Sequence, residues 1–106
     1  MEDIKNYKED LIQACMGLEK SRQEDAMAYY DRSSIESVAI LLVSDARREA
    51  ESVKRYADNR GYGYGEVGYN LNERVDDLAE EFPELKEYFS RLIHAYFSFF
   101  TEAEDL

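Results

Sequence analysis

Apolar residues near the start of the chain recur at spacings of three and four, the period of an amphipathic helix. This pattern covers about residues 3–17 or 3–20 and consists of Ile4, Tyr7, Leu11, Ala14, Cys15 and Leu18. Arg22 and Asp25 then stand where the apolar face would continue, and Ser21 with Glu24 matches a capping box. We therefore expect a break near residues 18–22 and a short helix to Tyr30, with one straight helix as the alternative.

The next pattern predicts the longest helix, from Ile35 to Ala57, with Ser33 and Glu36 as a capping box before it. Residues 38–43 are apolar on every side, which is typical of a segment deep inside a fold. A buried strand is the alternative for these six residues, but the continuous helical phase favours a helix. The apolar stripe consists of Ile35, Val38, Leu42, Ala46, Val53 and Tyr56, flanked by Ala39, Ala50 and Ala57.

Residues 59–70 are rich in glycine and tyrosine and predict a loop or a short irregular hairpin. Asn70 with Glu73 predicts the start of a third helix, whose apolar positions are Leu71, Val75, Leu78 and Phe82. Pro83 would end it and suits the first turn of a fourth helix, from about Glu84 to Phe100 or Thr101. The acidic tail from Thr101 onward is expected to fray.

The fourth helix is apolar over an arc of roughly 200°, twice what a surface helix needs. We favour a central place in the bundle, with Leu42, Val53, Leu85, Leu92 and Phe99 in the core. The alternative is that part of this face meets another chain, through Phe89, Ile93, Phe97 and Phe100. The pattern as a whole predicts one all-α domain over residues 1–106, a compact bundle of four main helices with a possible fifth short one.

The net charge of the chain limits the classes of partner that it can bind. The 106 residues carry 13 basic and 24 acidic side chains, a net charge of −11, so direct binding to nucleic acid or to an anionic membrane is not expected. The N-terminus is charged at once and the longest apolar run has six residues, which predicts neither a signal peptide nor a membrane span. We expect a cytoplasmic protein.

Candidate chemistry is sparse. One cysteine and one histidine exclude an internal disulfide and argue against a metal site, and no cofactor is expected. Gly63, Gly65 and Gly68 match a glycine-rich phosphate loop in letters, but a helix precedes them where a dinucleotide fold has a strand. Cys15 lies on an apolar stripe and is interpreted as a small buried side chain.

Carboxylates concentrate in the C-terminal half of the chain, and Asp76, Glu80 and Glu84 would form a row if one helix carried them. Such a row can occupy a groove built for phosphates, which is the physical basis of DNA mimicry. Tyrosines among glycines in the preceding loop are typical of recognition loops. The predicted partner-binding residues are Tyr62, Tyr64, Glu66, Tyr69, Glu73, Asp76, Asp77, Glu80, Glu81, Glu84 and Glu87.

The segment from Arg91 through His94 to Tyr96 resembles the Arg and His-x-Tyr motif of HEPN helical-bundle ribonucleases. The arginine stands closer to the histidine than in that family, and Leu92 stands where its toxin members have asparagine. The resemblance covers about six residues and implies RNA cleavage with His94 and Arg91 in the site. A partly exposed polar strip is the alternative interpretation of His94.

These observations favour a non-enzymatic inhibitor or adaptor that docks its acidic surface on a basic partner, and we expect this partner to be a nucleic-acid-handling enzyme or complex. DNA mimics, anti-CRISPR proteins and other phage anti-defence factors share this composition. A helical oligomerisation module, for example a homodimer formed through the fourth helix, is the alternative. A HEPN-like ribonuclease is a more remote one.

Overall fold

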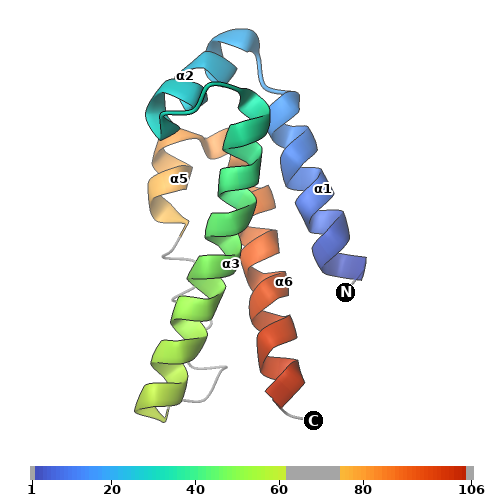
Figure 1. Ribbon diagram of the computed structural model, residues 1–106, viewed down its shortest axis with the longest axis vertical. Coiled ribbons are helices and arrows are strands. Elements are labelled where there is room, and N and C mark those ends of the chain that lie inside the picture. Colours follow the sequence, from blue (N-terminus) through green and yellow to red (C-terminus); the bar gives the residue numbers. More distant parts are fainter. Residues whose placement is uncertain (1, 62–74, 105–106) are drawn as a thin grey trace.

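The computed structural model describes residues 2–61 and 75–104 and shows an all-α compact bundle (Figure 1). Three helices form its body: α1 (Glu2–Met16), α3 (Ile35–Arg60) and α6 (Lys86–Glu104). Each of the three packs against the other two, and the α3–α6 contact is the most extensive. Within these residues there is no strand, which confirms the predicted fold class.

Two shorter helices lie at one end of this body. Helix α2 (Lys20–Tyr30) crosses the end where α1 stops and α3 begins, and α5 (Asp76–Glu81) lies below it beside α3 (Figure 1). A 3-10 turn, η1 (Pro83–Leu85), joins α5 to α6. The chain therefore brings the end of α5 and the turn that follows it next to α2, a neighbour that is more than 50 residues away in sequence.

The predicted break after the first helix is confirmed, so the single straight helix is wrong. The amide of Gly17 donates to the carbonyl of Gln13 at 2.8 Å, and the side chain of Gln23 donates back to the carbonyl of Met16 at 2.9 Å. The predicted capping box is wrong, because α2 begins at Lys20 and Ser21 lies inside it. Glu19 holds the N-cap position without a side-chain hydrogen bond.

Helix α3 confirms the long predicted helix and excludes the strand alternative for residues 38–43. Its cap is Ser34 and not Ser33, since the Ser34 hydroxyl accepts a hydrogen bond from the Ser37 amide at 3.1 Å. The helix continues to Arg60, so the loop does not begin at residue 59 as predicted. It ends at Gly61, whose φ of 71° is a left-handed conformation that suits glycine.

The stripe on α3 is buried as predicted except at Tyr56, which is 43% exposed. Ile40 is 67% exposed, so the expectation that residues 38–43 lie deep on every side is wrong. The reason is that α1, α2 and α6 cover only part of the circumference of α3. The buried positions of this helix are Ile35, Val38, Ala39, Leu42, Ala46, Ala50, Val53 and Ala57.

The predicted boundary at Pro83 is confirmed. Helix α5 ends at Glu81, and Phe82 leaves the helical conformation with φ −137° and ψ 70°. Val75, Leu78 and Phe82 are buried as the spacing predicted. The start of this helix, with Asn70, Leu71 and Glu73, lies outside the described residues.

Helix α6 buries most of its broad apolar face against α1 and α3, so most of that face lies inside the bundle as the favoured interpretation expected. Leu92 on α6 and Leu85 at the end of η1 are fully buried, and Leu42 and Val53 on α3 are each 2% exposed. Phe99 was expected in the core but is 38% exposed. Helix α6 continues beyond the expected end at Phe100 or Thr101 to Glu104, and the Thr101 hydroxyl donates to the Ser98 carbonyl at 3.1 Å.

Candidate protein-binding surface on α2 and α5

Helix α5 separates charge from apolar surface completely. Leu78 is buried against the bundle together with the flanking Val75 and Phe82. All four acidic residues of the helix are exposed: Asp76, Asp77, Glu80 and Glu81. Within the part of the chain that the structure describes, no ion pair is recorded for the side chains of these four.

The arrangement of these four carboxylates lowers the stability of α5. They form two like-charged pairs at i,i+4, Asp76 with Glu80 and Asp77 with Glu81, and each such pair destabilises a helix by roughly 0.2–0.5 kcal/mol. Asp76 and Asp77 lie in the first turn, where the helix dipole offsets part of this cost. Glu80 and Glu81 lie in the last turn, where negative charge is unfavourable and α5 has no basic residue.

The predicted row from Asp76 through Glu80 to Glu84 is not formed as one helical row. Helix α5 stops at Glu81, and Glu84 belongs to the 3-10 turn that follows. The cause is Pro83, whose ring and missing amide hydrogen prevent the helix from continuing. Glu84 is turned instead toward α2.

Arg22 on α2 holds Glu84. Its Nε and one terminal nitrogen donate to the two carboxylate oxygens of Glu84 at 2.7 and 3.0 Å, a bidentate pair. Arg22 also donates to the Glu81 carbonyl at 2.8 Å and to the Asp25 carboxylate at 3.2 Å. These hydrogen bonds lower the pKa of Glu84 below its usual value and keep it ionised. Arg22 therefore fastens α2 to the turn after α5.

An aromatic cluster lies directly beside this ion pair. The guanidinium of Arg22 sits 4.8 Å from the ring centroid of Phe82. Tyr29 meets the same ring edge-on at a centroid distance of 5.6 Å, and Tyr30 stacks on it at 6.1 Å. Burial raises the pKa of Tyr30 far above its usual value, so its hydroxyl stays neutral. Tyr29 is 52% exposed, which leaves a rigidly supported tyrosine at the edge of the acidic helix.

We define the α2–α5 acidic surface as Asp25, Tyr29, Asp76, Asp77, Glu80 and Glu81. Four of its members were predicted as partner-binding residues, whereas Asp25 and Tyr29 were not. A signal for the contribution of α2 was present: Arg22 and Asp25 are charged residues at positions where an apolar stripe was expected. What they contact could not be read from the sequence, because Glu84 is 62 residues away from Arg22.

The remaining predicted partner-binding residues divide into two groups. Glu87 is exposed on α6 and pairs with Arg91 at 2.6 Å, one turn along the helix. The residues of the Gly/Tyr-rich loop and of the expected helix start lie outside the described residues: Tyr62, Tyr64, Glu66, Tyr69 and Glu73.

The structure brings only part of the HEPN-type motif to one groove. His94 and Arg91 line an open groove of about 470 Å³ between α1 and α6. Tyr96 lines a different groove and is 7% exposed. Its ring stacks on that of Phe100 with a centroid distance of 6.0 Å. The two residues of the His-x-Tyr element therefore serve different grooves.

The remaining sequence features concern the cysteine, metal binding and membrane spans. Cys15 is fully buried, and burial raises the pKa of its thiol to about 11, as expected for an inert core side chain. Among the described residues, no cluster of three histidine, cysteine, aspartate or glutamate side chains could hold a metal ion. None of the helices in residues 2–61 and 75–104 is long and apolar enough to cross a membrane.

The residues predicted for self-association are mostly covered by the chain itself. Phe89, Ile93 and Phe97 are 4%, 0% and 7% exposed and belong to the core, so they are not available to a second chain in this fold. Phe100 is half-buried at the edge of the core. The exposed aromatic residue of this helix is Phe99, which had been assigned to the core.

Comparison of this chain with protein-family models, with curated proteins and with solved structures finds no match.

Proposed function

We propose that this protein is a non-catalytic binding module, an inhibitor or adaptor, which docks the α2–α5 acidic surface on a basic protein. The observation that carries the proposal is α5 itself. Its four carboxylates are exposed, lie in like-charged pairs and, at Glu80 and Glu81, stand where the helix dipole disfavours them. A local arrangement that costs stability is expected where function requires it.

The surface combines two features of recognition sites. Clustered negative charge attracts a basic partner over a distance and speeds association. Tyrosine is enriched at the centres of interfaces, and Tyr29 is held in place by Phe82 and Tyr30. Nucleic-acid-handling enzymes carry positively charged surfaces that complement the α2–α5 acidic surface, and we therefore propose them as the class of partner. A protein that occupies such a surface blocks access of nucleic acid, the mode of action of a DNA mimic or an anti-CRISPR inhibitor.

The test uses two variants with equal charge. Asp77→Asn with Glu80→Gln neutralises the acidic surface, and Asp10→Asn with Glu36→Gln neutralises two exposed carboxylates elsewhere. The pairs are matched, because Asp77 and Glu36 both lie in the first turn of a helix. Each tagged protein is used for affinity capture at low and moderate salt, with nuclease added to remove bridging nucleic acid.

We expect the wild type and the control pair to recover the same basic protein, and the Asp77/Glu80 pair to lose it. The activity of the recovered enzyme should fall when the wild-type protein is added. The change Tyr29→Ala should weaken the complex without changing the salt dependence of its affinity. Equal recovery by both variant pairs would contradict the proposal, as would capture that does not weaken with salt.

The oligomerisation alternative keeps one supporting observation, the exposure of Phe99 at the surface of α6. The change Phe97→Glu cannot test it, because Phe97 is a core residue and the charge would unfold the bundle. The informative change is Phe99→Glu.

A further inference from the structure

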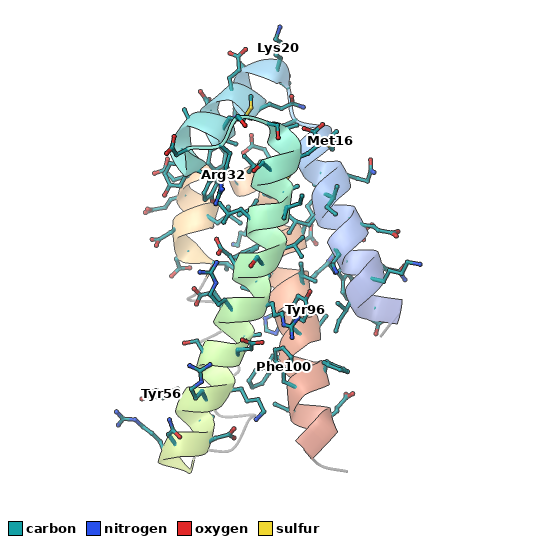
Figure 2. The ribbon with its side chains drawn as sticks, in the orientation of Figure 1. Met16, Lys20, Arg32, Tyr56, Tyr96 and Phe100 are labelled. Atoms are coloured by element: carbon teal, nitrogen blue, oxygen red, sulfur yellow. The ribbon has the colours of Figure 1, made fainter. Side chains whose placement is uncertain are left out.

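A second groove, of about 480 Å³, lies where the first half of α1 meets α6 and α3. Its apolar lining consists of Ile4, Ile12, Tyr96, Phe99 and Phe100. Tyr96 and Phe100 follow one another along α6, one turn apart (Figure 2), and their rings stack at an interplanar angle of 18°. The groove shares no residue with the α2–α5 acidic surface.

The rim of this groove is basic in a chain of net charge −11. It carries Lys5, Lys8 and Arg47 against the single carboxylate of Glu9. The structure records no ion pair for Lys5 or Lys8 within residues 2–61 and 75–104. Arg47 donates to Glu51 at 3.1 Å, and its guanidinium lies 6.0 Å from the ring centroid of Phe100.

Charge and shape together define the ligand that this groove fits. Apolar walls with a few convergent charges are typical of small-molecule sites, which measure about 300–1,000 Å³. The cations at the rim favour a negative group on the ligand, whereas the aromatic side chains favour an apolar body. A polyanion or an anionic bilayer is a poor fit, because it would face the other acidic surfaces of the same small protein.

We infer that this groove binds a free fatty acid of medium chain length. The carboxylate lies at Lys5 and Lys8, and the alkyl chain lies along the stacked rings of Tyr96 and Phe100. Binding removes alkyl and ring surface from water and supplies the two lysines with a counter-ion that the described chain does not provide.

The probe is sodium decanoate below its micelle concentration, titrated into the ¹⁵N-labelled full chain and followed by NMR. We expect saturable shifts in the amides of residues 4–12 of α1 and 95–101 of α6. Decyltrimethylammonium has the same chain and the opposite head charge, so it should leave these amides unchanged or bind at least tenfold more weakly. Acetate, which lacks the chain, should not saturate the site.

Two double variants with the same net charge separate local from global electrostatics. Lys5→Glu with Lys8→Glu reverses the rim of the groove, and Lys20→Glu with Lys86→Glu reverses two exposed lysines elsewhere. Lys20 lies at the far end of the molecule from Tyr96 and Phe100 (Figure 2). We expect the first pair to weaken decanoate binding at least tenfold and the second to change it less than twofold, with circular dichroism confirming that both fold.

Several results would overturn this assignment. They are an absence of saturable shifts, equal loss of affinity in both double variants, or tighter binding of decyltrimethylammonium at the same amides. Tighter saturation of the groove by an acidic amphipathic peptide would assign it to a protein partner instead. Groove signals that change with protein concentration alone would assign it to a second copy of this chain.

Discussion

Phe82 is the residue on which the α2–α5 acidic surface depends, and its replacement by alanine should be strongly destabilising. The side chain is 2% exposed and is surrounded by Tyr29, Tyr30 and the guanidinium of Arg22. Removal of a buried phenylalanine costs about 3–5 kcal/mol, since the apolar transfer energy is lost and a cavity remains. A chain of this length has a total stability of roughly 5–15 kcal/mol.

The assay is urea unfolding followed by helical circular dichroism, with the melting temperature as a second measure. At about 4 °C per kcal/mol for a domain of this size, Phe82→Ala should lower the melting temperature by roughly 12–20 °C. The matched control is Phe99→Ala. Because Phe99 is 38% exposed, this change should cost less than about 1.5 kcal/mol.

A loss of less than about 1 kcal/mol for Phe82→Ala would refute the reasoning, because a buried ring with three close neighbours cannot be removed at that cost. Equal losses for Phe82→Ala and Phe99→Ala would refute the assignment of one ring to the core and the other to the surface. Phe82→Leu keeps most of the apolar volume and should fall between the wild type and the alanine variant.

Four further predictions concern titration and assembly. Burial raises the pKa of the Cys15 thiol from 9.0 to about 11, so the free energy of unfolding should fall as pH rises from about 9 to 11, and Cys15→Ala should make this slope shallower in urea titrations. The hydrogen bonds of Arg22 lower the pKa of Glu84, so Arg22→Gln should move the carboxyl titration of Glu84 measured by NMR back up toward its ordinary value, and no movement would contradict the bidentate pair. The stability that Glu84 contributes is present above its ordinary pKa and is lost as pH falls through its lowered pKa, so acid unfolding of Arg22→Gln should begin at higher pH than in the wild type. If Phe99 forms an interface between copies, light scattering should show a dimer for the wild type and a monomer for Phe99→Glu, whereas a monomer for both excludes this role.

Local patterns in the sequence were sufficient for the elements and for most of the core. The three- and four-residue spacing predicts α1, α3 and α6 because each must bury one face, and every residue that matches the period within α3 except Tyr56 is buried. The break after α1 also follows from local signals, although the capping residues do not. Ser33 and Ser34 are chemically equivalent caps, and the choice between them depends on where the chain enters the bundle.

The α2–α5 acidic surface could be predicted from the sequence only in part. Four acidic side chains of α5 could be named from the sequence, because a helix with buried Val75, Leu78 and Phe82 must expose them. The contribution of α2 could not, since it depends on contacts between segments about 60 residues apart. Pro83 was recognised as a helix boundary, but its consequence, that Glu84 turns toward Arg22, depends on where α2 lies in the folded chain.

The sequence by itself determined the fold class, the order of the main helices and the sign of the net charge, because these depend on period, on breakers and on counted charge. Only the tertiary structure decided which exposed positions lie together. Ile40 lies in the apolar run of residues 38–43, outside the periodic stripe, and Phe99 lies in the apolar arc of α6, and yet both face solvent, because neighbouring helices cover only part of α3 and α6. Likewise Lys5, Lys8 and Arg47 are unremarkable in sequence and become one basic rim only because α1 and α3 meet at the same groove.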